Sequence, residues 1–353
     1  MNGLYEKATD LLSRLIAKPS FSKEEDGTAS IIREFLEKEG VTVHRTGNNI
    51  WAKNKLFTPN KPTVLLNSHH DTVKPNSGYT RDPFKPEIID GKLFGLGSND
   101  AGGPLVALIA TFLHFYNRSD LKYNVVLAAT AEEEISGTGG IESIWNALSP
   151  IDFAIVGEPT LCDMATAEKG LMVLDCTSKG KPGHAAREEG INAIYEALPD
   201  IDWFRHFKFP KRSAALGEMK MTVTIINAGS QHNVVPAECK FTVDVRVTDS
   251  YSLEDALEII RQHVKCDVRP RSLRIRSSGI AMDHPLVLSA KKMGLKLYGS
   301  PTTSDQALIP APSVKIGPGD SARSHSADEF IYLHEIEKGI ETYIALLNNV
   351  ISV

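Results

Sequence analysis

The stretch VVLAATAEEEISGTGG, residues 125–140, joins an apolar run to an unusual cluster of acidic residues. The apolar run is of the length and type that forms a buried strand. It is followed by Glu132, Glu133 and Glu134 and then by three glycines within four residues. Adjacent carboxylates repel each other and resist burial unless a cation or hydrogen bonds compensate them. A solvated turn is the simplest interpretation of the triplet, and a compensated acidic site is the alternative.

The same order, an apolar strand followed by polar residues, recurs in other segments. PTVLLNSHHD (62–71), DFAIVGEPT (152–160) and SVKIGPG (313–319) share it. Helical patterns alternate with these strands, which is typical of an α/β sheet. The expected helices are residues 4–18, 25–40 (closed by Gly40), 102–116, 141–149 and 333–350.

The sequence pattern changes near Glu168. Residues 171–180, 219–230 and 237–247 alternate apolar and polar side chains, as half-exposed antiparallel strands do. Helical patterns are found at residues 190–198 and 252–264. We therefore predict an α/β domain, residues 1–166 and 277–353, interrupted by an inserted α+β domain, residues 167–276. The insert is expected to contain a four-stranded antiparallel sheet and two helices.

Composition narrows the possible functions. The chain has 353 residues, 42% of them hydrophobic, and a formal net charge of −5, which gives no reason to expect nucleic acid as a partner. No apolar run approaches the ~20 residues of a spanning helix, and the N-terminus does not resemble a secretory signal. The four cysteines are scattered and suit reduced thiols. We expect a cytoplasmic protein without a membrane partner.

Acidic and imidazole side chains follow several of the predicted strands. Because open α/β sheets bind ligands at the carboxyl ends of their strands, these side chains are expected to meet at one edge. Two histidines with several carboxylates and no cysteine suit zinc or cobalt, with manganese also possible. The side chains concerned are His69, Asp71, Asp100, Glu133, Glu134, Glu158 and His325.

Each of these residues also has a purely structural interpretation. His69 could be a satisfied loop histidine, Asp71 a loop brace and Asp100 a helix cap. Glu158 could be a turn residue before Pro159. His325, in a serine-rich loop, could be exposed to solvent. These interpretations would all have to hold together, which favours a common site.

The same segments resemble the di-zinc amidohydrolase and metallopeptidase family of acetylornithine deacetylase, succinyl-diaminopimelate desuccinylase, aminoacylase and carboxypeptidase G. The resemblance extends over nearly the whole chain, and its motifs occur in the same order as in the family. They are SHHDTV (68–73), TRDPFKPEIIDGKLFGLGSNDAGG (80–103), TAEEE (130–134), VGEPT (156–160), GKPGHAA (180–186), NVVPAE (233–238), DVR (244–246), TTSD (302–305) and SHSADEF (324–330).

The resemblance implies a zinc-exopeptidase-like catalytic domain with a mixed sheet, and an insert that serves as a lid or dimerisation domain. It also implies two zinc ions per subunit, for which cobalt can substitute. Asp100 would bridge the two ions. His69 and Glu158 would complete one site, and Glu134 and His325 the other.

The resemblance also implies roles around the metal ligands. Asp71 would hydrogen-bond His69 and fix its tautomer, and Glu133 would be the general base and acid. The glutamate triplet leaves the choice between Glu132 and Glu133 ambiguous by one residue. Members of the family have a cis peptide after the bridging aspartate, here between residues 100 and 101.

In the insert, His184 matches a family histidine that reaches the active site of the partner subunit, so the resemblance implies a homodimer formed through the insert. Asn233 and Arg246 match residues that hold the substrate carboxylate, and Thr303 and Ser304 match a loop that lines the substrate pocket. Without the resemblance, His184 would be interpreted as a loop residue and Arg246 as a surface residue.

The implied reaction is removal of the acyl group from an N-acyl amino acid, with acetylornithine in arginine biosynthesis as the first choice. Succinylornithine, acetylcitrulline, acetyl-lysine and succinyl-diaminopimelate are competing substrates, and a metallo-exopeptidase of the same family is a further alternative. Two other classes compete: a binuclear phosphoesterase, which leaves the Glu133–Glu134 pair unexplained, and a non-catalytic relative that retains only the fold.

Overall fold

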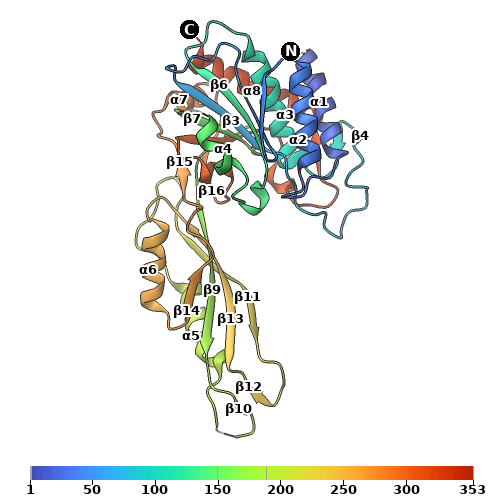
Figure 1. The fold of residues 1–353 in the computed structure, drawn as a ribbon. Coiled ribbons are helices and arrows are strands. Elements are labelled where there is room, and N and C mark those ends of the chain that lie inside the picture. The colour runs from blue at the N-terminus through green and yellow to red at the C-terminus, as the bar shows by residue number, and fades with distance from the viewer. Residues whose placement is uncertain (1, 149, 188, 353) are drawn as a thin grey trace. The chain divides into compact units, whose positions relative to one another are not determined.

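The computed structural model describes residues 2–148, 150–187 and 189–352 (Figure 1). Ser149, the last residue of one expected helix, lies outside these ranges. Contacts divide the chain into two compact units. Unit 1 consists of Met1–Ala167, Gly279–Tyr298 and Ser304–Val353, and unit 2 of Glu168–Ser278 and Gly299–Thr303.

A mixed sheet forms the centre of unit 1. Within the described residues its strand order is β1-β2-β6-β3-β7-β17-β8-β15, with β16 paired to β8. The neighbours β6, β3, β7 and β17 run parallel, whereas β1, β2 and β8 pair antiparallel. The strands are β1 (Val43–Thr46), β2 (Asn49–Lys53), β3 (Thr63–His69), β6 (Asn124–Thr130), β7 (Phe153–Gly157), β8 (Met164–Glu168), β15 (Ser278–Gly279), β16 (Leu297–Ser300) and β17 (Ser313–Ile316).

Helices cover both faces of this sheet, so its central strands are apolar on both sides. In β6, Val125 and Leu127 pack into the cluster that contains α3 and α8, whereas Val126 and Ala128 pack into the cluster that contains α4. The apolar helix α3 is buried along most of its length and has Pro104 in its first turn, where a missing N–H costs nothing. The helices of unit 1 are α1 (Asn2–Ile16), α2 (Asp26–Lys38), α3 (Gly103–Tyr116), α4 (Ile141–Leu148), α7 (Pro285–Lys292) and α8 (Leu333–Ile351).

A small antiparallel sheet joins two loops that are far apart in the sequence. Its order is β18-β5-β4, with strands β18 (Phe330–Tyr332), β5 (Lys92–Phe94) and β4 (Glu87–Ile89). Because Phe330 pairs with Phe94, the segment after His325 lies beside the segment that leads to Asp100. The described part of unit 1 also contains the short helical turns η1 (Ser98–Gly102), η2 (Glu133–Ile135), η3 (Asp305–Leu308) and η4 (Ser321–Arg323).

Unit 2 is a four-stranded antiparallel sheet with two helices packed on one face. Its strand order is β11-β13-β9-β14, and alternate residues of β9, such as Met172 and Leu174, are buried in its core. The elements are β9 (Gly170–Lys179), β11 (Lys220–Ala228), β13 (Glu238–Val247), β14 (Asp267–Pro270), α5 (Ala193–His206) and α6 (Leu253–His263), with a two-stranded ribbon of β10 (Gly183–His184) and β12 (Val234–Val235). The predicted fold class, a mixed-sheet α/β domain with an inserted four-stranded α+β domain, is confirmed.

One predicted helix of unit 2 has different ends in the structure. We predicted a helix at residues 190–198, but α5 begins at Ala193 and continues through Pro199 to His206. Its start is set by Asn192, whose side-chain oxygen accepts the backbone N–H of Ile194.

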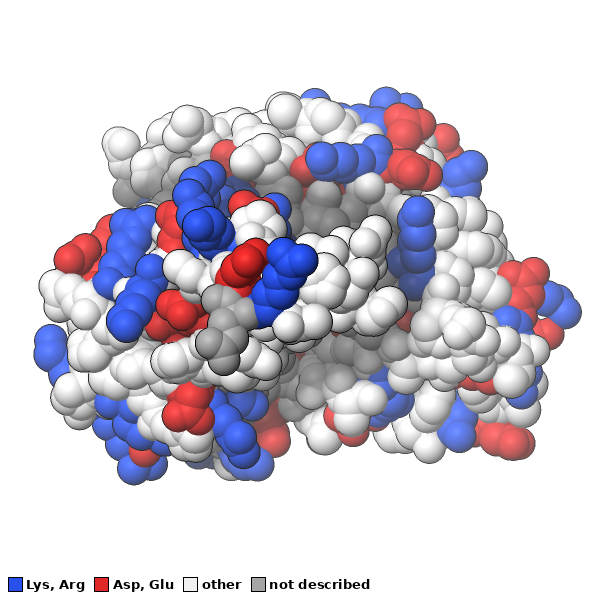
Figure 2. All heavy atoms as spheres, turned by 90° about the horizontal axis from the view of Figure 1, so that it is seen from below, with Lys and Arg blue, Asp and Glu red and all other residues white. Residues whose placement is uncertain are grey.

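In the part of the chain that the structure describes, no helix combines the length and apolar character required to cross a bilayer. On the face shown in Figure 2, Lys and Arg side chains are interspersed with Asp and Glu.

Candidate metal centre

Segments that are far apart in the sequence converge at the carboxyl ends of the parallel strands. His69 is the last residue of β3, Glu158 directly follows β7, and Glu133 opens the turn η2 after β6. A carboxylate oxygen of Glu133 and one of Glu158 each lie 3.7 Å from His69 Nε2. The structure therefore brings these three side chains together at the edge of the sheet where the parallel strands end.

His69 is held so that one ring nitrogen faces the acidic cluster. Its Nδ1 lies 3.0 Å from the backbone carbonyl oxygen of Asp71 and 3.4 Å from Asp71 Oδ1. Because a carbonyl oxygen only accepts, Nδ1 carries a proton, and in the neutral ring Nε2 keeps the lone pair that a metal ion would bind. Nε2 is buried and has no hydrogen-bond partner among the described residues.

Asp100 lies in η1 with its two carboxylate oxygens directed at two different histidines. Oδ1 is 3.3 Å from His69 Nε2, and Oδ2 is 3.7 Å from His325 Nε2. The expected cis peptide between Asp100 and Ala101 is present. This arrangement gives one carboxylate access to two neighbouring positions.

Asp71 organises the backbone of the glutamate turn as well as the His69 ring. Its two oxygens accept the backbone N–H groups of Glu133, at 3.0 Å, and Glu134, at 3.2 Å. Ser22 donates its hydroxyl to the same carboxylate at 2.7 Å. Asp71 therefore sets the positions of His69, Glu133 and Glu134 together.

Glu132 is turned away from the cluster, so the ambiguity within the triplet has a structural answer. Its backbone is left-handed, with φ 58°, and its carboxylate accepts the backbone N–H of Gly139. A Cβ at Gly137 or Gly139 would lie 2.0 or 2.2 Å from a Glu132 carboxylate oxygen. The glycines after the triplet make room for Glu132, and Glu133 is the member that faces His69.

His325 approaches the cluster from the loop after η4. Its Nε2 lies 3.1 Å from Glu134 Oε2, and its own backbone is left-handed, with φ 60°. The side chain is 54% exposed, whereas that of His69 is 1% exposed. His325 therefore forms the open side of the cluster.

The acidic surroundings shift the pKa values of both histidines upward. Burial alone would lower the pKa of His69, but Glu133, Asp100 and Asp71 raise it well above its ordinary value. The hydrogen bond to Glu134 raises the pKa of His325 to about 9. Both rings act as the positive charges that the carboxylates require.

The pKa values of the carboxyl groups move in opposite directions. Burial, reinforced by Glu158, Asp305 and Glu134, raises the pKa of Glu133 well above its ordinary range. Burial also acts on Asp100, but the His69 ring outweighs it and lowers the Asp100 pKa. Neighbouring carboxyl groups with separated pKa values are typical of acid–base sites.

The donor set fits divalent metal ions. The possible ligand atoms of His69, Asp100 and Glu134 lie within 4.8 Å of one another, and so do those of His69, Glu133 and Glu158. A buried imidazole nitrogen without a partner, surrounded by carboxylates and without cysteine, suits zinc, cobalt or manganese.

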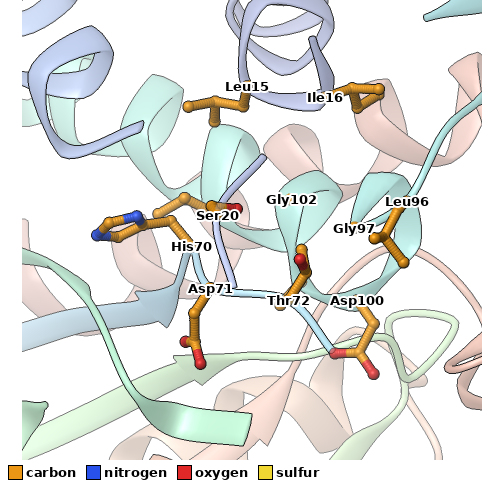
Figure 3. Close-up of a pocket in the computed structure, with 12 residues that line it drawn as sticks. Leu15, Ile16, Ser20, His70, Asp71, Thr72, Leu96, Gly97, Asp100 and Gly102 are labelled. Carbon is orange, nitrogen blue, oxygen red and sulfur yellow. The ribbon is translucent and has the colours of Figure 1, made fainter. Parts of the chain in front are cut away.

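A cavity of about 20 Å³ lies behind the ligands, between the end of α1 and the turn η1. Figure 3 shows the Asp71 and Asp100 carboxylates on the side of this cavity that faces away from Leu15 and Ile16. The buried hydroxyl of Thr72, which lines it, has no hydrogen-bond partner among the described residues. The cavity has room for about one water molecule.

Several buried residues near the site were not predicted from the sequence. Glu25 accepts the backbone N–H of Glu132, and His70 bonds Thr28 and the carbonyl of Asn48. Asp305 accepts the Thr130 hydroxyl at 2.6 Å, and burial raises its pKa to about 6. Glu329 accepts backbone N–H groups of η1, and burial together with Asp100 raises its pKa to about 8.

These residues escaped prediction because their partners are backbone groups or side chains distant in the sequence. The one available signal was membership in a motif: Asp305 closes TTSD, and Glu329 lies in SHSADEF.

The predicted substrate residues of the insert belong to unit 2. His184 is exposed and pairs with Val234, and the carbonyl of Asn233 accepts the N–H of Ala185, so His184 and Asn233 are neighbours. Arg246 makes two hydrogen bonds to Asp244, through Nε at 2.8 Å and Nη2 at 3.0 Å.

The predicted pocket residues Thr303 and Ser304 are consecutive but belong to different units. Ser304 is buried and caps η3, where its hydroxyl accepts the N–H of Gln306. This hydrogen bond gives Ser304 a structural role in addition to the predicted one.

The α/β sheet has a histidine–carboxylate cluster at its carboxyl edge, and one carboxyl group among the possible metal ligands has a raised pKa. This combination is typical of a metal-dependent hydrolase. Comparison with known proteins agrees. The profile of peptidase family M20/M25/M40 matches residues 65–349, and the chain therefore belongs to this family of metal-dependent hydrolases.

Relatives of known name are similar along nearly the whole chain. Acetylornithine deacetylase of Proteus mirabilis is 28% identical over 371 residues, covering 96% of each chain. Succinyl-diaminopimelate desuccinylase of Psychromonas ingrahamii is 25% identical over 378 residues, covering 97% of this chain and 98% of the relative. The resemblance stated from the motifs is confirmed at the level of the family.

Solved structures share the fold at low identity. The M20 family metallo-carboxypeptidase Sso-CP2 from Sulfolobus solfataricus has a TM-score of 0.76 at 18% identity, covering 96% of this chain and 98% of that one. The YXEP protein of Bacillus subtilis, described as a dinuclear metal binding peptidase, has a TM-score of 0.73 at 15% identity and covers 99% of each chain.

We predict that metal binding to the metal-free protein depends strongly on pH. Because the pKa of His325 is raised to about 9, its ring is protonated at pH 7 and must lose a proton to bind a metal. Metal affinity is therefore expected to rise as the pH increases toward 9. Titration calorimetry with Zn²⁺ at pH 7, in two buffers of different ionisation enthalpy, would measure the protons released.

A matched control is His206→Asn, which removes an exposed histidine paired with Asp202 outside the cluster. It should leave the proton release unchanged. An affinity independent of pH, with no proton released in the wild-type protein, would contradict the prediction.

Proposed function

We propose that the chain removes the acyl group from an N-acyl amino acid, with N-acetylornithine as the first-choice substrate. The observation that carries the proposal is the position of Asp100, whose two oxygens face His69 and His325 while Glu133 lies against the same His69 nitrogen. This geometry supports two adjacent metal positions, and the carboxyl group beside them has a raised pKa.

Two zinc ions would be held by these residues, with cobalt or manganese as substitutes. His69, Asp100 and Glu158 would hold one ion, and Asp100, Glu134 and His325 the other. When bound, the paired ions would polarise the acyl carbonyl and lower the pKa of water toward about 7.

Glu133 would move the proton during hydrolysis. Its raised pKa lets its carboxylate accept a proton from the attacking water, and the resulting acid then donates that proton to the leaving amine. Asp71 keeps Glu133 in place through the backbone N–H bond. The products are a carboxylate and a free α-amino group.

His184 would stabilise the oxyanion. Its Nδ1 accepts the backbone N–H of Ala186 at 3.1 Å, so the neutral ring carries its proton on Nε2 and can donate it outward. One well-placed donor to an oxyanion contributes about 3–4 kcal/mol to catalysis.

A homodimer through unit 2 would bring this histidine to the partner's metal centre. β11 is an edge strand, and it exposes the large aliphatic side chains of Ile225 and Ile226, while α5 exposes Tyr195 and Leu198. Exposed apolar residues on an unpaired edge strand favour pairing with a second chain.

Asn233 and Arg246 would hold the substrate carboxylate, with Thr303 and Ser304 lining the pocket. The Arg246 contacts with Asp244 use Nε and Nη2, which leaves Nη1 available for a carboxylate. A small-molecule substrate in the cytoplasm, without nucleic acid or membrane, remains the expected setting.

Peptide hydrolysis is the second candidate function. It is favoured by the match of residues 65–349 to the profile of peptidase family M20/M25/M40.

A hydrolysis panel would test the proposal directly. The substrates are acetylornithine, succinylornithine, acetylcitrulline, acetyl-lysine, succinyl-diaminopimelate and an unblocked dipeptide. We expect the highest kcat/KM with acetylornithine, measured by release of the free amine. A preference for the dipeptide would favour the exopeptidase, and inactivity toward every N-acyl substrate would contradict the proposal.

Glu133→Gln should retain metal and lose activity. The amide keeps the shape of the carboxyl group but cannot accept the proton, so kcat should fall about 10²- to 10⁴-fold. Elemental analysis and steady-state kinetics would measure the two effects.

The matched control for that experiment is Glu132→Gln, in the same triplet but facing Gly139. It should stay close to wild-type activity. If Glu132→Gln were inactive and Glu133→Gln active, the general base would have to be reassigned.

Coexpression of two inactive variants would test whether subunits share the site. His184→Ala and Glu133→Gln chains, with different tags, should form mixed dimers with one intact site. Statistical assembly then predicts about one quarter of wild-type activity. Each variant expressed alone is the control, and a purified mixed dimer without activity would show that His184 does not act across the interface.

A further inference from the structure

The SHSADEF motif, residues 324–330, contains a buried carboxylate that is not among the predicted metal ligands. Glu329 is 2% exposed, and its side chain accepts three backbone N–H groups of the loop that carries Asp100. Oε2 accepts Gly97 N at 3.0 Å, and Oε1 accepts Asn99 N at 2.8 Å and Asp100 N at 2.9 Å.

Glu329 also holds the start of the same loop. Its backbone carbonyl accepts the N–H of Gly95 at 2.9 Å, and the neighbouring strand β18 pairs with β5. Asn99 exchanges two hydrogen bonds of 3.0 Å with the backbone of Asp320, which holds the turn from another segment. The loop is therefore fixed on both sides before any ligand binds.

The packing around η1 leaves little room for an alternative loop conformation. Gly97 has φ 74°, and a Cβ there would lie 2.5 Å from the Thr72 side chain. Gly102 is as tightly packed as Gly97, because a Cβ at Gly102 would lie 2.4 Å from the carbonyl oxygen of Gly97. The backbone around Asp100 is therefore closely packed as well as hydrogen-bonded to Glu329.

A buried carboxylate is costly unless N–H groups or positive charge compensate it. Glu329 receives three N–H bonds, and a cation bound by Asp100 would favour the charged form of Glu329. The cation would gain from that negative charge behind Asp100, and the N–H bonds hold the backbone of Asp100 in place.

We propose that Glu329 is a positioning residue for the paired metal ions, which orients Asp100 through the backbone of η1; this inference rests on the proposed metal centre. Its side-chain oxygens accept backbone N–H groups, and it is not among the predicted metal ligands. A purely structural role would instead affect the stability of the protein and leave the properties of the bound metal unchanged.

Glu329→Gln tests the proposal in the full-length protein. The glutamine keeps one side-chain oxygen, which can still accept two of the three backbone N–H groups. Its NH₂ group faces the third N–H, and the negative charge of the carboxylate is lost. After metal removal by a chelator, Co²⁺ is titrated and followed by its visible absorption. We expect the Kd for Co²⁺ to rise about 10- to 100-fold and the absorption spectrum of the bound Co²⁺ to change. In steady-state kinetics, kcat should fall by a larger factor than KM changes.

Asp200→Asn is the matched control. Asp200 is a buried carboxylate that accepts the backbone N–H groups of Lys265 and Cys266, away from the predicted metal ligands. This variant should lower the Tm while Co²⁺ affinity and spectrum stay those of the wild type.

The outcomes separate this inference from the proposed function. If the wild-type protein bound no Co²⁺, the metal centre itself would be wrong. If the wild type bound Co²⁺ and Glu329→Gln bound it with the same Kd and spectrum, only the role of Glu329 would be overturned.

A second measurement does not require the glutamine variant to fold. Residue-resolved hydrogen exchange on the metal-free wild-type protein should find the amides of Gly97, Asn99 and Asp100 protected. Rapid exchange of these amides would overturn the proposal. If Glu329→Gln does not fold, Glu329→Asp, which keeps the charge but is one methylene shorter, should also bind Co²⁺ more weakly.

Discussion

The concentration of negative charge at the carboxyl edge of the sheet is the constraint on which this site depends. Carboxylate oxygens of Asp100, Glu133 and Glu158 lie 3.3–3.7 Å from the buried Nε2 of His69, and possible ligand atoms of His69, Asp100 and Glu134 lie within 4.8 Å of one another. Carboxylates this close raise each other's pKa values unless cations hold them. The histidines, with pKa values shifted upward, compensate only part of that charge.

The fold holds the acidic groups in place with a second set of carboxylates that accept backbone N–H groups. Asp71 holds the turn of Glu133 and Glu134, Glu25 holds Glu132, and Glu329 holds the loop of Asp100. Each of these three carboxylates accepts a hydrogen bond from the backbone of a residue in or beside the cluster. This arrangement positions charged side chains without placing further cations next to them.

The fold was predictable because its signals are local. Apolar runs marked β3, β6, β7 and β17, and the alternating pattern of unit 2 marked its antiparallel strands. The short strands β1, β2, β4, β5 and β18 were not predicted, since each has too few residues to show a clear pattern. The end of α5 was also missed, because an internal proline usually suggests that a helix stops.

The site was predictable only as far as residue type and strand position allow. Strand ends predicted the convergence of His69, Glu133 and Glu158, whereas three identical side chains in a row could not show which one faces the cluster. That choice depends on the left-handed backbone of Glu132 and the space left by Gly137 and Gly139. The contacts of Glu329 could not be predicted from the sequence, since its partners are backbone amides more than two hundred residues away.

The most direct test of this account is elemental analysis of protein prepared without chelator, combined with activity before and after metal addition. The account predicts two equivalents of zinc or another divalent transition metal per chain. Fewer than one tightly bound equivalent, with no activity gained on adding zinc or cobalt, would contradict it.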